Sequence, residues 1–256
     1  MALISIITIN FNDASGLQKT IESVVNQSFQ DFEFVVIDGH STDHSVDVIK
    51  KYTRINSWIS EPDKGIYDAQ SKGALKAIGQ YSLFLNSGDV LADANVLNKI
   101  APYLQSDKSF YYGNLLLDIN GTVEKHIAPK EVDLDFMLNS TFWHPSVFIK
   151  TELFHKYGAY NADFKICGDY EFFIRCLIKP GITCEYINEF ITLFDGNGIS
   201  NNKEQETKQL KERELAWKLN VSDIVYNALK QQNSFARSKY SSLINSIQRI
   251  RGKQGF

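Results

Sequence analysis

The chain has 256 residues, a formal net charge of −3, a hydrophobic fraction of 43% and a charged fraction of 22%. These values are ordinary for a soluble globular protein with one large domain, alone or with an appendage, and they argue against a nucleic-acid-binding protein. Three cysteines without metal-ligand spacing predict reduced thiols in a cytosolic protein. The sequence starts without a signal-peptide pattern, and no apolar run approaches the about 18–20 residues that cross a bilayer, so any membrane contact is expected at the surface.

The first hundred residues alternate between strand and helix patterns. Ile4–Ile9 is β-branched and almost wholly apolar, which predicts a strand buried on both faces, and Asp13 to Gln27 follows with apolar residues at helical spacing. Further strands are predicted at residues 32–37, 57–60 and 81–85, and further helices at residues 46–52 and 67–78. This alternation predicts an α/β fold, in which a mostly parallel central sheet carries helices on both faces.

The pattern changes after about residue 105. Residues 110–119 and 122–127, joined by Asn120-Gly121, predict a β-hairpin. Short helices are predicted at residues 151–157 and from near Asp169, and the chain becomes helical and charged from Lys203. We therefore predict a domain at residues 1–202, with a donor half at about 1–105 and an acceptor half at about 106–202, and a helical C-terminal extension at 203–256.

Acidic residues follow two of the predicted buried strands. Asp38 comes directly after the strand at 32–37, and Asp89 closes the turn after the strand at 81–85. Open α/β sheets bind ligands at the carboxyl ends of their strands, so these carboxylates are candidate ligand-binding groups. An alternative for Asp38 is turn chemistry with the following glycine, and an alternative for Asp89 is a solvated turn acid.

Five segments, in this order along the chain, resemble the family-2 glycosyltransferases with the GT-A fold, in particular bacterial members that build cell-surface polysaccharides. They are Ser5–Asn12, Val35–Asp43, Ser60–Ala69, Phe84–Asp89 and Cys167–Phe172, and the resemblance covers roughly residues 3–200. It implies an inverting, metal-dependent enzyme that moves a sugar from a nucleotide-diphosphate sugar to a hydroxyl of a glycan or lipid-linked acceptor. A UDP-linked donor is favoured.

The resemblance also assigns the donor site. It implies that the nucleotide sugar is bound by Thr8, Asn10, Asp38, Asp63, Asp68, Asn86 and Ser87. Asp89 would hold Mn²⁺ or Mg²⁺ against the donor diphosphate, where a hard cation stabilises the leaving group. Asn86 and Gly88 stand where relatives often carry acids, so Asp89 is expected to be the one carboxylate that this loop gives to the metal. Asp68 and Lys72 also have the spacing of an ordinary helix ion pair.

The resemblance assigns the catalytic base to Asp169. An inverting transfer needs one group that takes a proton from the attacking hydroxyl, and a carboxylate in a partly dry cleft can do so. Relatives often carry Glu-Asp where this chain has Gly168-Asp169. Asp169 could also be the N-cap of a helix with the core-facing residues Phe172 and Phe173, and Glu171 is a lower-ranked rival base.

The acceptor is expected to enter near His144 and Trp143, because similar proteins carry a comparable residue before the strand that precedes the base. Trp143 could offer a flat face to a sugar ring. The alternative is that both side chains belong to the core.

Two C-terminal features carry open alternatives. The segment Phe194–Ser200 resembles a glycine-containing loop that closes over the bound donor, or is an ordinary connection. Between residues 237 and 251, apolar residues recur at helical spacing opposite Arg and Lys. This helix suits peripheral contact with the inner face of the cell membrane, packing on the core, or pairing in a homodimer.

Two other functions are compatible with parts of this sequence. A sugar nucleotidyltransferase needs a glycine-rich basic loop after the first strand, and Asn10-Phe11-Asn12-Asp13 has neither glycine nor a basic residue. A non-catalytic sugar- or lipid-binding subunit with a decayed site would fit the acids missing at positions 86, 88 and 168. Against it, Asp89 and Asp169 are both present.

Overall fold

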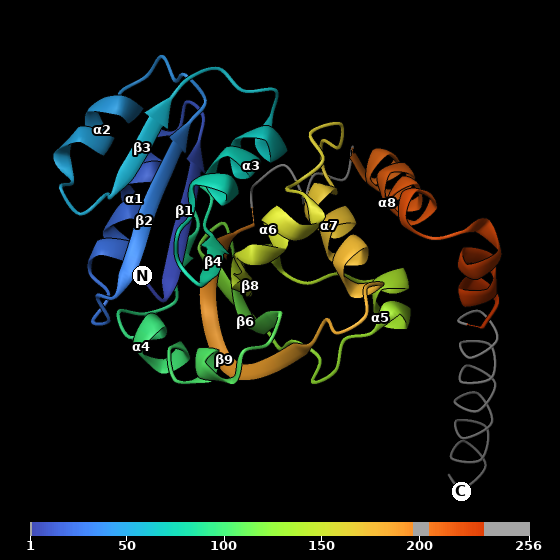
Figure 1. Cartoon of the computed structure of the whole chain (residues 1–256). Helices are drawn as coiled ribbons and strands as arrows, with labels where there is room; N and C mark the ends of the chain where they lie inside the picture. Colours follow the sequence, from blue (N-terminus) through green and yellow to red (C-terminus); the bar gives the residue numbers. More distant parts are fainter. Residues whose placement is uncertain (1, 197–204, 233–256) are drawn as a thin grey trace, which may run out of the picture.

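The computed structural model describes residues 2–196 and 205–232, and within them one curled, nine-stranded sheet carries helices on both faces (Figure 1). The strand order is β3-β2-β1-β4-β8-β6-β9-β5, with β7 paired to β6. The strands are β1 (Ile4–Asn10), β2 (Phe32–Asp38), β3 (Ser57–Ser60), β4 (Tyr81–Phe84), β5 (Val90–Leu91), β6 (Phe110–Ile119), β7 (Thr122–His126), β8 (Val147–Lys150) and β9 (Cys184–Asp195). The helices are α1 (Ala14–Val25), α2 (Ser45–Lys51), α3 (Ile66–Lys76), α4 (Val96–Ile100), α5 (Leu134–Asn139), α6 (Glu152–Tyr157), α7 (Gly168–Leu177) and α8 (Glu206–Asn220), with 3₁₀ turns η1 (Tyr103–Ser106) and η2 (His144–Ser146).

The donor half is parallel because it is built from strand–helix–strand units. β1 lies between β2 and β4 and is parallel to both, and β3 extends the sheet beyond β2. Alternate side chains of β1 enter different cores: Ile7 packs in the cluster that includes α3, and Ile6 packs in the cluster that includes α1. The apolar run at the start of the sequence therefore reflects burial on both faces, as expected.

The acceptor half adds antiparallel pairs to this sheet. β8 is antiparallel to β4 and β6, and β7 forms a hairpin with β6. Asn120 and Gly121 both have positive φ, 53° and 84°, as a tight hairpin turn requires, so the predicted hairpin is confirmed. β9 runs parallel to β6 and then pairs with β5, which returns the chain to the loop after β4. The predicted α/β fold, a mostly parallel sheet with flanking helices, is confirmed.

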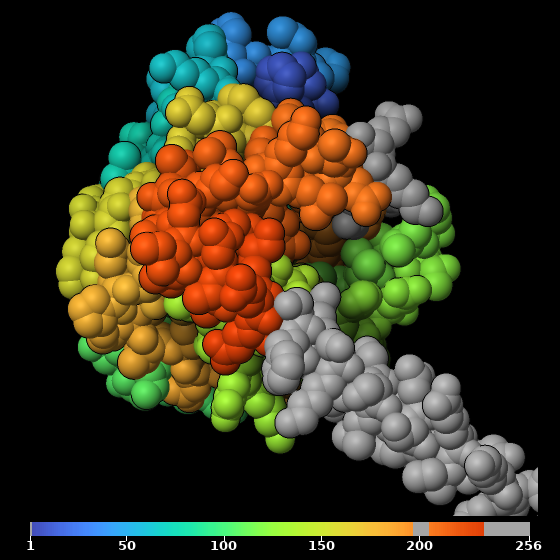
Figure 2. All heavy atoms as spheres, turned by 90° about the vertical axis from the view of Figure 1, so that its right-hand side faces the viewer, coloured from blue at the N-terminus to red at the C-terminus, as the bar shows by residue number. Residues whose placement is uncertain are grey.

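Helix α8 forms an additional layer outside α7. Its Trp217 is 2% exposed and donates a hydrogen bond of 2.7 Å from Nε1 to the hydroxyl of Tyr170 in α7. Figure 2 shows the orange-to-red segment, residues 205–232, lying over the side of the molecule that contains the yellow α6 and α7. The start of the C-terminal extension is thus packed against the sheet domain.

Several predictions concern residues outside the described ranges. The proposed domain boundary at 202, most of the Phe194–Ser200 loop and the basic helix at residues 237–251 lie there. The division into 1–202 and 203–256, the membrane contact and the homodimer therefore stay predictions. Among the described residues, no helix is both long and apolar enough to span a bilayer.

Candidate active site

The carboxyl ends of β1, β2 and β4 meet in one hydrogen-bonded row. Asn10 ends β1 and donates from Nδ2 to Asp38 Oδ1 at 2.8 Å, and Ser87, after β4, donates from its hydroxyl to Asn10 Oδ1 at 2.8 Å. Parallel neighbours end at the same edge, so three predicted donor-site residues that are far apart in sequence become neighbours.

Asp38 is the centre of this row and is fully buried. Oδ1 accepts from Asn10 at 2.8 Å and from the Ser41 hydroxyl at 2.5 Å, and Oδ2 accepts from the Ser41 amide at 3.0 Å and the Ser60 hydroxyl at 2.6 Å. Burial alone would raise the pKa of Asp38, but these hydrogen bonds outweigh burial and lower it. Because two carboxylate oxygens accept about four hydrogen bonds, Asp38 has no acceptor capacity left and organises the edge instead.

Asp63 and Phe11 both approach Gly39, in the turn after β2. A Cβ built on Gly39 would lie 2.5 Å from Asp63 Oδ2 and 3.2 Å from the Phe11 ring, so both side chains approach Gly39 closely. Phe11 is 66% exposed. Its place between Asn10 and Asn12, directly after a buried strand, is the sequence signal for this residue, although it was not among the predicted site residues.

Two other predicted donor residues, Asn86 and Asp68, make hydrogen bonds within the chain. Asn86 accepts from Gln70 Nε2 at 3.2 Å. Asp68 accepts from the Lys64 amide at 3.0 Å and lies 3.5 Å from Lys72 Nζ, so it closes its own loop and forms the expected helix ion pair.

Thr8 lies within β1, before the donor edge. Its side chain is fully buried two residues before the end of β1, and its Oγ1 has no hydrogen-bond partner in the described part of the chain. The role of Thr8 in donor binding stays a prediction.

Asp89 is a buried carboxylate with one oxygen unused. It is 3% exposed, Oδ1 accepts from the Asp195 amide at 3.2 Å, and Oδ2 has no hydrogen-bond partner among the described residues. Burial, together with the negative charge of Asp195, raises the pKa of Asp89 to about 7.

Asp195 brings a second carboxylate to this point from the end of β9. A Cβ built on Gly88, which has φ 99°, would lie 3.5 Å from Asp195 Oδ2. A buried oxygen without a partner and a neighbouring carboxylate fit the oxygen ligands that Mn²⁺ and Mg²⁺ take. Asp195 was expected only as part of a loop, and an acid directly before glycine at a strand end is the signal that could have identified it. Within the described ranges no three His, Cys, Asp or Glu side chains cluster as a metal site.

Asp169 lies in the first turn of α7 and is half-buried. The hydroxyl of Tyr67, from the first turn of α3, lies 2.9 Å from Asp169 Oδ1 and 2.6 Å from the Ile166 carbonyl, so it can donate to either. Burial, and then the charge of Asp169, hold the pKa of Tyr67 well above its usual value, so the phenol remains a donor.

The alternatives for this helix are settled by the same geometry. The N-cap of α7 is Cys167, so the interpretation of Asp169 as the N-cap is wrong, whereas Phe172 and Phe173 are in the core as expected. Glu171 is 4% exposed and is paired with Arg175 at 3.0 Å, and it also accepts from Asn220. Glu171 is therefore engaged structurally, which leaves Asp169 as the accessible carboxylate of the segment.

The segment before Asp169 is held by a residue that the sequence did not identify. Glu212 in α8 accepts hydrogen bonds from the backbone amides of residues 165, 166 and 167 at 2.8–3.1 Å. These N–H groups lie immediately before the first turn of α7, where a helix leaves amides without partners. Nothing local in the sequence predicts this contact, because 45 residues separate Glu212 from Cys167.

His144 belongs to an aromatic cluster beneath this region. It is 8% exposed, its Nε2 lies 2.7 Å from the Tyr160 hydroxyl, and its ring stacks on Phe84 at 4.9 Å. Burial lowers the pKa of His144, partly offset by the charge of Asp169, so the ring is neutral near pH 7. The structural alternative therefore applies to His144, whereas Trp143 is only partly buried and lines a cavity.

Comparison with known proteins agrees with this architecture. The family model "Glycosyl transferase family 2" matches residues 5–167. A PGL/p-HBAD biosynthesis glycosyltransferase of Mycobacterium bovis is 25% identical, with 97% of this chain and 98% of the relative covered. An uncharacterized glycosyltransferase of Mycobacterium tuberculosis is 30% identical, with 78% of both chains covered.

Two solved structures share the GT-A fold. S. aureus TarS in complex with UDP-GlcNAc matches with a TM-score of 0.63 and 18% identity, over 76% of this chain and 58% of that one. The mannosyltransferase PcManGT from Pyrobaculum calidifontis, in complex with GDP-Man and Mn²⁺, matches with a TM-score of 0.56 and 14% identity, over 75% and 56%. The chain thus spans less than two thirds of the length of either structure.

Proposed function

Because this chain belongs to glycosyl transferase family 2, we propose that it is an inverting, metal-dependent member of that family. It would transfer a sugar from a UDP-linked donor to a hydroxyl of a glycan or lipid-linked acceptor in bacterial polysaccharide synthesis. The observation that carries this proposal is the buried carboxylate of Asp89, which has an unused oxygen and lies beside the exposed Asp195 near the hydrogen-bonded strand ends. The complexes of TarS with UDP-GlcNAc and of PcManGT with GDP-Man and Mn²⁺ support a nucleotide sugar and a cation.

The nucleoside would bind at the edge formed by β1 and β2. The exposed ring of Phe11 offers an apolar face to a base, and Asp63 offers a carboxylate beside the same glycine, Gly39. Asn10 and Ser87 are held by Asp38 and each other, so their orientation is fixed before the donor arrives.

Asp89 and Asp195 would hold Mn²⁺ or Mg²⁺. The cation would stabilise the negative charge that develops on the leaving diphosphate. Without a cation, Asp89 is a buried carboxylate with an unused oxygen, which costs free energy. This arrangement supports a site that becomes favourable when a cation binds.

Asp169 would take the proton from the acceptor hydroxyl. It is half-buried, and a hydrogen bond from the Tyr67 hydroxyl would fix its orientation. A base on the face of the sugar opposite the diphosphate gives inversion at the anomeric carbon.

The test is thermal stabilisation by UDP-, GDP-, dTDP- and CMP-sugars, each with and without Mn²⁺. We expect UDP-sugars to raise the Tm in a Mn²⁺-dependent way in the wild type and in Asp169→Asn. Asp89→Asn should lose the Mn²⁺-dependent part, and Asp163→Asn, an exposed acid elsewhere, should behave as wild type. Transfer should fall at least about a hundred-fold in Asp169→Asn, the loss typical of a general base.

The outcomes separate the alternatives. Normal turnover by Asp169→Asn would exclude it as the base, and an unchanged Mn²⁺ response in Asp89→Asn would exclude it as a metal ligand. If the wild-type protein binds a donor but transfers its sugar to no acceptor tested, the alternative of a non-catalytic binding subunit is favoured.

A further inference from the structure

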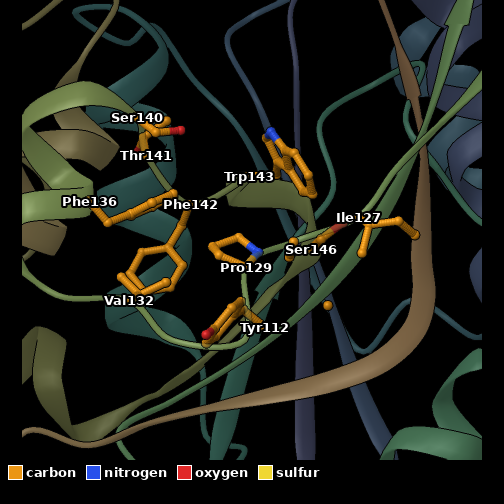
Figure 3. A pocket seen from close by; sticks show the side chains of 12 residues that line it. Tyr112, Ile127, Pro129, Val132, Phe136, Ser140, Thr141, Phe142, Trp143 and Ser146 are labelled. Atoms are coloured by element: carbon orange, nitrogen blue, oxygen red, sulfur yellow. The ribbon is translucent and has the colours of Figure 1, made fainter. Parts of the chain in front are cut away.

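A mostly apolar cavity of about 180 Å³ lies in the acceptor half (Figure 3). Its walls come from β6, the segment after β7, α5 and the segment that leads into η2. Figure 3 shows the Trp143 ring on one side of this space and the rings of Phe136 and Phe142 on the other, with Tyr112 closing it.

The size and chemistry of the cavity select its ligand. A protein cavity of about 150 Å³ with apolar walls is known to accept benzene, so this cavity holds one six-membered aromatic ring. A sugar ring is a poor fit, because each buried hydroxyl without a partner costs free energy. The hydroxyl of Ser146 already donates to the Asn114 carbonyl, at 3.4 Å.

One polar atom in the wall has no partner in the described part of the chain. Thr141 Oγ1 is buried and makes no hydrogen bond. A ligand that joins an apolar ring to an oxygen would satisfy this hydroxyl and leave the remaining wall in apolar contact.

The cavity shares a helix face with the proposed base. Phe142 in its wall packs against Phe173 of α7, with ring centroids 4.8 Å apart. Phe173 and Asp169 are four residues apart on that helix, so they lie on the same face about 6 Å apart along the axis. His144, next to Trp143 in the chain, is close enough to sense the charge of Asp169.

We propose that this cavity is an aglycone site, which binds a ring-sized apolar group attached to the acceptor sugar. An oxygen that links the two would meet Thr141, and the sugar would extend toward Asp169. The assignment of the ligand as an acceptor rests on the proposed function, whereas binding of the ring itself does not.

The test uses the full chain labelled with 5-fluorotryptophan and ¹⁹F NMR. Its three tryptophans lie in different parts of the molecule: Trp58 in β3, Trp143 in the cavity and Trp217 in α8. Benzyl alcohol, a ring with one hydroxyl, should shift the Trp143 resonance saturably and leave the other two unchanged. Methyl β-D-glucopyranoside, a sugar without the ring, should not reproduce this shift at the same concentrations.

A substitution that fills the cavity tests whether the ring binds there. Ala128 lines the cavity and is 6% exposed, so Ala128→Leu should weaken benzyl alcohol binding at least about ten-fold, as expected when added side-chain volume excludes the ring. Ala94→Leu, at an exposed position, is the matched control and should bind as wild type.

The failure of each proposal is recognisable. No saturable Trp143 shift in the wild type, or equal shifts at all three tryptophans, would overturn the aglycone site even if UDP-sugars stabilise the protein. A saturable Trp143 shift without any donor stabilisation would leave the apolar site standing and overturn the transferase assignment. Once a donor is identified, a phenyl glycoside should have a KM at least about ten-fold below that of the methyl glycoside, the gain expected from burying one ring.

Discussion

The ring of Tyr67 explains why position 168 is a glycine. A Cβ on Gly168 would lie 2.6 Å from the Tyr67 ring, closer than real Cβ contacts. The ring occupies the space that a side chain at 168 would need, and its hydroxyl reaches Asp169. The missing acid before Asp169 therefore reflects a different local packing, and does not by itself indicate a decayed site.

Gly168→Ala should therefore damage the site through Tyr67. We expect the free energy of unfolding to fall by about 1–3 kcal/mol, the usual cost of overpacking. The kcat should fall at least about ten-fold, with the Tm shift by donor unchanged, because the donor edge is not touched. Urea unfolding and initial rates measure the two effects.

The control is the same substitution without the ring. In a Tyr67→Ala background, which removes the atoms that a Cβ at 168 would meet, Gly168→Ala should cost less than about 0.5 kcal/mol. Equal costs in both backgrounds would show that the Tyr67 ring is not the obstacle.

At this scale the sequence predicted the residues that lie at strand ends and missed those that act across the sheet. Asn10, Asp38 and Ser87 could be placed together because parallel strands end at a common edge. The contacts of Tyr67 with Asp169 and of Asp89 with Asp195 join residues 102 and 106 positions apart. No local pattern encodes such a separation.

Among the elements, α8 shows how the C-terminal extension reaches the active site. Leu210, Leu215 and Leu219 are exposed, so this helix is not held by a continuous apolar stripe. It is held by particular contacts, Trp217 on Tyr170 and Glu212 on the amides before α7. We infer that Glu212 is a positioning residue for Asp169.

Glu212→Ala leaves three amides without their acceptor. The free energy of unfolding should fall by about 1–3 kcal/mol, because the partly buried amides of Ile166 and Cys167 lose their acceptor. The kcat should fall, while the donor KM and the donor-induced Tm shift stay as in wild type. Chemical denaturation and steady-state kinetics test both parts.

Glu214→Ala is the matched control in the same helix. Glu214 is 50% exposed and pairs with Lys218 alone among the described ion pairs, so its loss should cost less than about 1 kcal/mol. If Glu212→Ala and Glu214→Ala behaved alike, the contact to residues 165–167 would not position the base.

Element prediction succeeded where one periodicity dominated. β1, β2 and β4 follow the expected pattern because they are wholly buried, and α1 and α3 follow it because each has one buried face. β9 was not predicted, because Cys184–Asp195 mixes apolar residues with Asn188 and Glu189 and is buried unevenly along its length. β9 is a strand because it pairs with β6 and β5, and its own sequence pattern does not indicate this.

At the scale of the whole molecule, the donor and acceptor halves share both cores. The cluster on the α1 side of the sheet joins Ile6 and Leu83 to Tyr111 and Ile187, and the cluster on the α3 side joins Ile7 to Phe110 and Phe172. Trp217 of α8 belongs to the second cluster. A core that draws on every part of the described chain should unfold as one unit.

We therefore expect the donor edge and α8 to lose their structure together. Trp58 lies in β3 and Trp217 in α8, two elements at opposite sides of the molecule (Figure 1), so they report on different parts of it. In the 5-fluorotryptophan protein, both resonances should disappear at the same urea concentration, because coincident transitions by different probes are the mark of two-state unfolding. A bound donor should raise both midpoints equally, since a ligand that binds only the native state stabilises the whole cooperative unit. A Trp217 transition at lower urea would instead make the predicted boundary near residue 202 a true folding boundary, and the contacts of Glu212 would then be those of a helix that docks on a finished domain.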